Sequence, residues 1–352
     1  MSRHDATVIR RVVACAALAT ALVALSALLT VARNGLGLPD LLMPGRFGPS
    51  VGVIQRDLPD ARLQPTVGSD GQQFYALARD PVHLREVAPD LDRPRYRAQR
   101  ILLPVLAWAL HPSGGGRGLI VALLAVNLAG VALGSAAVAF LAMRANRSPL
   151  WGLAFAGAPG TIMSARMSVP DALALALALG AFVALLRGRS GMAAVAAAAA
   201  VLAKESTLLV LIGLAFYPMP SARHRLRALV VVPTLVVSAW ALALVRLLPH
   251  VHGAQYTEAG LPLVGLARAV SYWVHAPDLG AALGVVSGLA LAVVALVTRR
   301  RSPHRAAIVL QLGFLLFVSR ATFQYFVSGP RTVLPVTILG VLALLEPAPV
   351  EG

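Results

Sequence analysis

The chain has 352 residues, of which 58% are apolar and 13% charged, with a mean hydropathy of +0.75 and a formal net charge of +16. Soluble domains carry about 25% charged residues. The polar residues here are too few to cover a globular surface, which excludes an ordinary soluble enzyme, and the apolar content excludes a disordered chain. One cysteine, Cys15, excludes a disulfide framework and a Cys-rich metal site. The composition predicts an all-α, polytopic integral membrane protein.

The positive charge is arginine, grouped in short clusters between apolar runs. Lys204 is the only lysine, and the arginine clusters lie at residues 10–11, 144–147, 187–189, 223–227 and 299–305. This spacing is typical of cytoplasmic loops under the positive-inside rule. A nucleic-acid-binding protein would instead carry a contiguous basic surface on a soluble face, so we expect no nucleic-acid partner.

The apolar run at residues 12–31 predicts the first membrane span, behind Arg10 and Arg11. A cleaved signal peptide is the alternative, but the length of the run and the spans that follow it favour an uncleaved anchor. A span needs roughly 20 apolar residues, and fewer where it is packed in protein. Further spans are predicted to begin near Leu119, Leu150, Pro170, Met192, Ser206, Ala228, Leu279, Ala306 and Val333. The pattern therefore predicts about ten transmembrane helices, while the apolar segment 101–110 is short and predicts an interfacial or re-entrant helix.

The arginine clusters orient these spans. With the N-terminus in the cytoplasm, alternation places every cluster on the cytoplasmic side and leaves residues 33–118, 164–170, 204–205, 249–278 and 320–331 outside. The two spans beside Lys204 are kept separate, because joining them would move the cluster at 299–305 to the outside. We predict a single membrane domain, residues 1–352, in a bacterial plasma membrane, with residues 33–118 as an extracytoplasmic first loop that carries amphipathic helices.

The first outer loop contains the strongest chemical signal. Asp70 lies between Ser69 and Gly71, which suits a turn with a helix starting just after it, and Phe74 and Leu77 would share one face of that helix. We expect an amphipathic helix along the membrane interface. A carboxylate at a helix N-terminus is favoured in its ionised form by the helix dipole, and in that form it accepts a proton or binds a metal.

Several segments together resemble the polytopic glycosyltransferases of the GT-C superfamily. The loop reads DGQQFY at residues 70–75 and RYRAQRILLP at 95–104, and later segments read VPDAL at 169–173, LAKES at 202–206 and GPRTVLP at 329–335. The motif matches cover about a fifth of the chain, and the layout of one long first outer loop and about ten spans matches over its whole length. Many members have two acidic residues together in this loop, whereas Asp70 follows Ser69, so metal dependence is left open.

The resemblance implies a lipid-linked sugar donor, commonly a polyprenyl phosphate sugar, that reacts on the outer face of the membrane with inversion at the anomeric carbon. The acceptor would be a glycan, lipid or protein of the cell envelope. Asp70 matches the loop aspartate that acts as general base on the acceptor hydroxyl. The resemblance carries over no cofactor with certainty, and a divalent cation is one option.

The remaining site residues follow from their charge and position. Ionisable groups inside membrane spans cost roughly 2.5–3.5 kcal/mol each and tend to be paired and functional. Lys204 and Arg331 are predicted to hold the donor phosphate, since cations stabilise the charge that develops on a phosphate leaving group. Supporting polar groups are predicted at Asp171, Arg79, Glu205 and Arg166, with Arg320 as a weaker candidate.

Each of these residues also has a plain structural interpretation. Asp70 and Asp171 suit helix N-termini, Lys204 and Glu205 suit side chains that reach the interface, and Arg331 suits an anchor before a span. A group of His250, His252, His275, Glu258 and Asp278 lies in one outer loop, but its spacing does not favour zinc.

Two other functions remain open from the sequence. A transporter or lipid flippase would carry charges near the membrane midplane and inverted repeats, and the sequence shows neither. A non-catalytic membrane assembly protein would have a first loop without a cleft, with Asp70 facing water.

Overall fold

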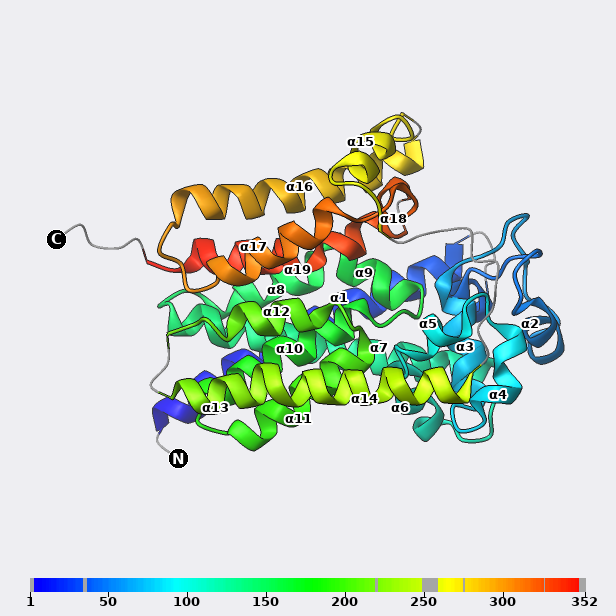
Figure 1. The fold of residues 1–352 in the computed structure, drawn as a ribbon, viewed down its shortest axis with the longest axis horizontal. Coiled ribbons are helices and arrows are strands. Elements are labelled where there is room, and N and C mark those ends of the chain that lie inside the picture. Colours follow the sequence, from blue (N-terminus) through cyan, green and yellow to red (C-terminus); the bar gives the residue numbers. More distant parts are fainter. Residues whose placement is uncertain are drawn as a thin grey trace.

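The computed structural model of the protein describes residues 3–33, 37–218, 221–248, 259–274, 276–325 and 327–347. Within these ranges the chain is helical and forms no strand; the extended backbone pairs only at two isolated bridges, Gly45 with Gln64 and Ala259 with Val318. The predicted histidine cluster falls outside the described residues except for Asp278. Most helices lie roughly parallel to the long axis of the molecule, and a group of short helices covers one end (Figure 1).

The first half of the chain contains one long helix, a group of short loop helices, and a second long helix. Its elements are α1 (Arg3–Ala32), η2 (Leu38–Leu42), α2 (Val51–Asp57), α3 (Asp70–Arg79), α4 (Leu84–Val87), η3 (Ala88–Asp90), α5 (Pro94–Ala98), α6 (Leu102–Leu110), α7 (Gly116–Arg144), η4 (Pro149–Gly152), α8 (Leu153–Gly157) and α9 (Pro159–Arg166).

The second half is a series of helices joined by short turns or by loops. Its elements are α10 (Asp171–Leu186), α11 (Ser190–Ala203), α12 (Thr207–Leu214), α13 (Ala222–Leu226), the π-helical turn η5 (Arg227–Val231), α14 (Val232–Leu247), α15 (Val264–Val270), α16 (Ala276–Thr298), α17 (Arg305–Leu316), α18 (Arg320–Gln324) and α19 (Gly329–Leu345).

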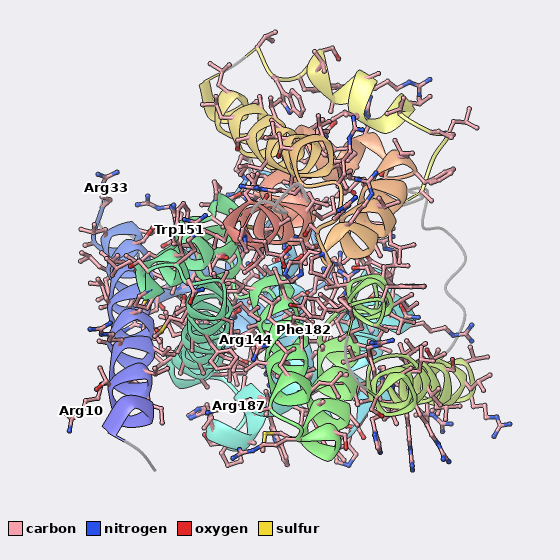
Figure 2. All side chains as sticks on the ribbon, turned by 90° about the vertical axis from the view of Figure 1, so that its left-hand side faces the viewer. Arg10, Arg33, Arg144, Trp151, Phe182 and Arg187 are labelled. Atoms are coloured by element: carbon pink, nitrogen blue, oxygen red, sulfur yellow. The ribbon has the colours of Figure 1, made fainter. Side chains whose placement is uncertain are left out.

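The two ends of the bundle differ in charge. Arg144, Tyr217, Arg299 and Glu346 line one cavity, although they come from four separate turns of the chain. Arg187 lies at the same end of the bundle, because its guanidinium lies 5.4 Å from the ring of Phe140, which is one helical turn before Arg144. Figure 2 looks onto this end, which we call the arginine end. The opposite end holds residues 37–115, and we call it the loop end.

Turns at alternate ends fix the direction of the helices. Lys204, in the turn after α11, bonds to Asp171 at the start of α10, whereas Tyr217, just after α12, lies at the arginine end. The chain therefore reverses between α11 and α12, as expected from keeping these segments separate. Gly213 makes the packing of α12 possible, because a Cβ there would lie 2.2 Å from Cα of Ala307 on α17; small residues permit such close helix approach.

Four helical stretches among the described residues are long and apolar enough to cross a membrane: Thr7–Ala32, Gly116–Arg144, Ala222–Leu247 and Asp278–Thr298. Shorter apolar helices are Asp171–Leu186, Ser190–Ala203, Arg305–Leu316 and Gly329–Leu345. The α12 helix has 8 residues, or about 12 Å at 1.5 Å per residue, against about 30 Å of hydrocarbon. The membrane character is thus borne out, while the structure does not establish ten spans.

The loop helix α3 differs from its prediction. It begins at Asp70 as expected, but residues 71–78 are all buried, so α3 is not an amphipathic helix on an interface. Phe74 and Leu77 pack with the loop helices around Leu84, while Tyr75 and Ala78 pack on the opposite side against α6 and α7. The polar residues Gln72 and Gln73 are buried too, so α3 forms the core of the loop end.

Candidate functional site

A half-open cavity of about 560 Å³ lies where the loop end meets the long helices. Its walls come from α3, α5, α10, α12, α17, α18, α19 and the turn after α11. The residues whose side chains matter below are Asp70, Tyr96, Arg97, Arg100, Asp171, Lys204, Glu205, Leu209, Phe314, Phe317, Val318, Ala321, Tyr325 and Arg331. The cavity therefore joins segments that are up to 261 positions apart in the chain.

The DGQ segment positions Asp70 at the edge of this cavity. Ser69 caps α3 by accepting a hydrogen bond from the Gly71 amide at 3.3 Å. Gly71 must lack a side chain, because a Cβ there would lie 2.3 Å from the Met167 carbonyl oxygen. The Gln72 side chain donates to the Val67 carbonyl at 2.6 Å and accepts from the Gly45 amide at 3.1 Å. Each residue of the motif thus has a separate structural role around the aspartate.

Carboxylates and cations alternate along one wall of the cavity. Asp70 accepts from Arg97 Nη1 at 2.7 Å through Oδ1 and from Arg331 Nη2 at 3.3 Å through Oδ2. Arg331 also donates to Asp171 Oδ2 at 3.2 Å, and Asp171 Oδ1 accepts from Lys204 Nζ. Arg331 is buried and joins the loop aspartate to the aspartate of α10. This chain of contacts is the ionic network discussed below.

Glu205 points away from Lys204 to a separate partner. Its carboxylate accepts two hydrogen bonds from Arg100, at 3.0 Å from Nε and 2.7 Å from Nη2. Arg100 also donates to the Tyr96 hydroxyl at 2.7 Å, and its guanidinium lies 4.5 Å from the Tyr96 ring centroid. This bidentate geometry is the strong form of an arginine–carboxylate pair, and it fixes the turn between α11 and α12 to α5.

The arginines keep Asp70 ionised. Burial by itself would raise the pKa of the Asp70 carboxyl, but the charges of Arg97, Arg331 and Arg100 outweigh burial and hold the pKa well below its ordinary value of 3.8. A carboxylate in this state is a weak base while both guanidiniums remain on it. Any group that withdrew Arg331 from Asp70 would raise the pKa of Asp70 towards the ordinary value.

The cavity has one polar and one apolar wall. Four cations line it, namely Arg97, Arg100, Lys204 and Arg331, together with three carboxylates, and a fourth carboxylate, Asp92, pairs with Arg97 from outside the cavity. The facing wall is apolar and includes Leu209, Phe314, Phe317, Val318 and Ala321. The side chains of Phe314 and Phe317 are also among the exposed large apolar residues. The arrangement suits an anionic ligand with an apolar tail, provided that the anion takes the place of a carboxylate on one or more of the cations.

The structure brings together five of the seven residues predicted from the sequence. Asp70, Asp171, Lys204, Glu205 and Arg331 all line the cavity. The other two predicted residues lie elsewhere, as does the weaker candidate Arg320.

Arg79, at the far end of α3, forms an ion pair with Asp57, about 14 Å along the helix from Asp70 at 1.5 Å per residue. Arg166, at the end of α9, is close enough to Arg33 to be repelled by it and is not among the residues that line the cavity. The weaker candidate Arg320 donates to the Tyr272 hydroxyl at 3.0 Å on the surface. Arg79, Arg166 and Arg320 therefore do not contact the cavity.

Sequence reasoning missed two arginines of the site. Arg97 and Arg100 belong to the RYRAQR segment and are three residues apart, which places them on one face of a helix. Arg97 is held by Asp92 through two hydrogen bonds of 2.8 and 2.7 Å, and this leaves Nη1 directed at Asp70. The three-residue spacing of Arg97 and Arg100 was the signal available in the sequence. The nearby Arg93 and Arg95 obscured it.

The described residues contain no group of three His, Cys, Asp or Glu side chains placed to hold a metal ion. Each carboxylate that lines the cavity is bonded to a cationic side chain. A divalent cation at this position would therefore have to displace an arginine or the lysine.

Comparisons with protein-family models, with curated proteins and with solved structures found no match for this chain. The function is therefore argued from the cavity itself.

Proposed function

We propose that the protein is an integral membrane glycosyltransferase of GT-C type that moves a sugar from a polyprenyl phosphate donor to an acceptor hydroxyl. The observation that carries the proposal is the cavity in which an ionic network with four cations on its wall faces an apolar wall. A polyprenyl phosphate sugar is a phosphodiester with one negative charge and a long apolar chain. Both of its chemical features have a counterpart in the cavity.

In this proposal the donor phosphate replaces carboxylates as the partner of the cations. Lys204 and Arg331, each bonded to Asp171, would turn to the phosphate oxygens and stabilise the charge that develops as the phosphate leaves. Withdrawal of Arg331 leaves Asp70 with Arg97 alone. Its pKa then rises, and Asp70 becomes a better base for the acceptor hydroxyl at the moment when the donor is bound.

The proposed setting is a bacterial plasma membrane with the loop end outside. The clustered arginines at the arginine end match the positive-inside rule. The four shorter apolar helices, together with α12 and with α8 and α9 counted as one segment, would then complete a set of about ten spans. The acceptor would be a glycan, lipid or protein that approaches the half-open cavity from the loop end.

The test is sugar transfer in membranes that contain the protein, supplied with radiolabelled polyprenyl phosphate sugars. Asp70→Asn should lower the transfer rate by about 10²–10⁴-fold, the usual contribution of a general base. Asp60→Asn is the matched control, because Asp60 belongs to the same loop but forms an exposed pair with Arg117. Transfer by Asp70→Asn at the rate of the unaltered protein would remove the proposed base.

The same membranes, as sealed vesicles, can be used to distinguish the transporter hypothesis from the transferase hypothesis. A labelled lipid that crosses the bilayer in a protein-dependent way, without loss of its sugar, would favour a flippase. Release of polyprenyl phosphate that depends on Asp70 supports the transferase.

A further inference from the structure

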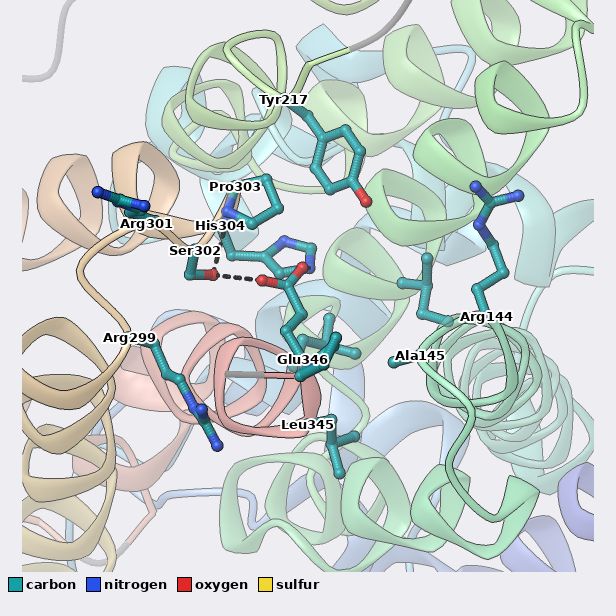
Figure 3. A pocket seen from close by; sticks show the side chains of 13 residues that line it. Arg144, Ala145, Tyr217, Arg299, Arg301, Ser302, Pro303, His304, Leu345 and Glu346 are labelled. Carbon is teal, nitrogen blue, oxygen red and sulfur yellow. Dashed lines mark hydrogen bonds and ion pairs between the residues drawn. The ribbon is translucent and has the colours of Figure 1, made fainter. Parts of the chain in front are cut away.

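A second cavity lies at the arginine end, away from the ionic network. Its volume is about 310 Å³, and it is enclosed by the end of α7, the end of α19, the loop before α17 and Tyr217 after α12. Figure 3 shows Arg144 and Arg299 on opposite sides of this cavity, with His304 and Glu346 between them. None of its residues contributes to the proposed transfer site.

Three guanidiniums in this cavity lack a carboxylate partner. Within the described residues, Arg144, Arg299 and Arg301 form no ion pair. Arg299 reaches the Leu344 carbonyl at 3.4 Å, and its Nε is buried without a hydrogen-bond partner. In the ionic network at the loop end, by contrast, each arginine contacts a carboxylate. Three positive charges around one cavity with a single carboxylate among them leave a positive excess, so this cavity favours an anion.

Glu346 supplies only part of that counter-charge, because its carboxylate attracts Arg299 without forming an ion pair with it. Its carboxylate accepts a hydrogen bond from Ser302 Oγ at 2.9 Å and lies 3.4 Å from His304 Nε2. Burial raises the pKa of the Glu346 carboxyl and lowers the pKa of the His304 imidazole to about 4. The glutamate is therefore turned towards Ser302 and a neutral histidine, and it forms no ion pair with any of the three arginines.

Neutral polar groups complete the cavity. His304 is buried, with its ring 5.7 Å from that of Tyr217 and 6.0 Å from that of Phe182. Its Nδ1 is buried and has no hydrogen-bond partner among the described residues. The order of contacts, with Glu346 between Ser302 and His304, is not that of a nucleophilic triad, in which histidine lies between serine and the carboxylate. The cavity thus has features of a binding site rather than of hydrolytic chemistry.

We infer that this cavity at the arginine end binds a phosphate group, carried either by a lipid headgroup or by a soluble phosphate ester. Arginine presents several N–H groups in a plane that matches phosphate oxygens. The cavity lies at the ends of α7 and α16, two helices long enough to cross a membrane. Basic pockets between membrane helices at the cytoplasmic side take anionic headgroups. The inference does not depend on the proposed transferase activity.

The test uses the purified full chain in a neutral detergent with two probes, phosphatidylglycerol and inorganic phosphate. The binding of each is followed through the rise of the thermal midpoint with probe concentration. The variant is Arg144→Gln together with Arg301→Gln, because both side chains are exposed and their loss should not prevent folding. The control is Arg189→Gln together with Arg300→Gln, two exposed arginines of the same end that do not line the cavity.

We expect the Arg144/Arg301 variant to bind phosphatidylglycerol at least tenfold more weakly and the Arg189/Arg300 control to change by less than twofold. In a competition experiment, inorganic phosphate is added at about 10 mM, on the order of a weak ligand's dissociation constant. If phosphatidylglycerol binding is unchanged by this addition, the ligand is a lipid headgroup. Phosphate binding that shows the same dependence on Arg144 and Arg301 identifies a soluble ester. Equal losses in both double variants would show attraction to the whole basic end and would overturn the inference, as would the absence of binding by both probes.

Discussion

The pair of Arg100 and Glu205 allows the strength of a buried ion pair at the site to be measured independently of function. Two hydrogen bonds of 2.7 and 3.0 Å join the side chains, of which 12% and 31% are exposed. Glu205→Leu leaves the Arg100 guanidinium with the Tyr96 hydroxyl and no carboxylate within ion-pair distance. Breaking a fully buried pair costs about 3–5 kcal/mol and an exposed pair contributes about 0–1 kcal/mol, so breaking this partly buried pair should cost about 2–3 kcal/mol. The reverse change, Arg100→Met, should cost a similar amount.

The double variant, Arg100→Met with Glu205→Leu, should lose much less stability than the two single variants together. Replacement of a buried pair by apolar side chains is often neutral, so the coupling energy should be about 3 kcal/mol or more. The assay is equilibrium unfolding in mixed micelles with an increasing fraction of sodium dodecyl sulfate, followed by tryptophan fluorescence.

The exposed pair of Arg117 and Asp60 serves as the control for this cycle, with side chains 63% and 54% exposed. Exposed pairs contribute about 0–1 kcal/mol, so Arg117→Met and Asp60→Leu should show little coupling. If the costs of Arg100→Met and Glu205→Leu simply add, the two side chains do not act as a pair, and the structural reasoning fails.

Two further predictions concern α3 and the second cavity. Gly71→Ala places a Cβ against the Met167 carbonyl and should destabilise the protein by about 1–3 kcal/mol, whereas Gly52→Ala, where nothing lies within 4 Å, should be neutral or stabilise by up to about 1 kcal/mol; equal effects would contradict the close approach at Gly71. Burial lowers the pKa of His304 from 6.5 to about 4, so the unfolded chain binds a proton first as the pH falls, and about 3 kcal/mol of stability should be lost between pH 6.5 and 4. The raised pKa of Glu346 acts in the opposite direction, so the measurement is the difference in pH slope between the unaltered protein and His304→Gln, and identical slopes would refute it.

The helical layout could be predicted to a large extent from hydropathy and arginine positions. The reversal at Lys204 followed from keeping the arginine clusters on one side, and the structure contains that reversal. The lengths of the shorter helices could not be derived, because hydropathy does not reveal where the chain turns inside protein. The short α12 is an example, since its apolar sequence continues beyond the helix to Tyr217.

The burial of α3 was missed for a specific reason. Gln72 and Gln73 look like the polar face of an amphipathic helix, but both side chains are bonded to the backbone of other loop segments, Gln73 to the Asp92 amide at 3.2 Å. Buried glutamine is rare unless its hydrogen bonds are satisfied, and sequence alone does not show which backbone groups are nearby.

The site residues that were found and missed differ in their surroundings. Lys204, Glu205 and Asp171 were conspicuous because they interrupt apolar runs, where a charge is costly. Arg97 and Arg100 lie in a loop rich in arginine, where one more charge carries little information. Arg79 lies on the same helix as Asp70, but the length of α3 places the two at opposite ends.

The position of Lys204 makes the protein chemically unusual. It is the only lysine among 352 residues, and its side chain, 18% exposed, lies within the cavity and contacts Asp171. An amine-selective reagent therefore has one side-chain target in the whole chain. The extent of labelling at that single side-chain atom, read on the peptide that contains Lys204 so that the N-terminal amine is distinguished, becomes a direct gauge of whether the cavity is open or filled, without any need to know what fills it.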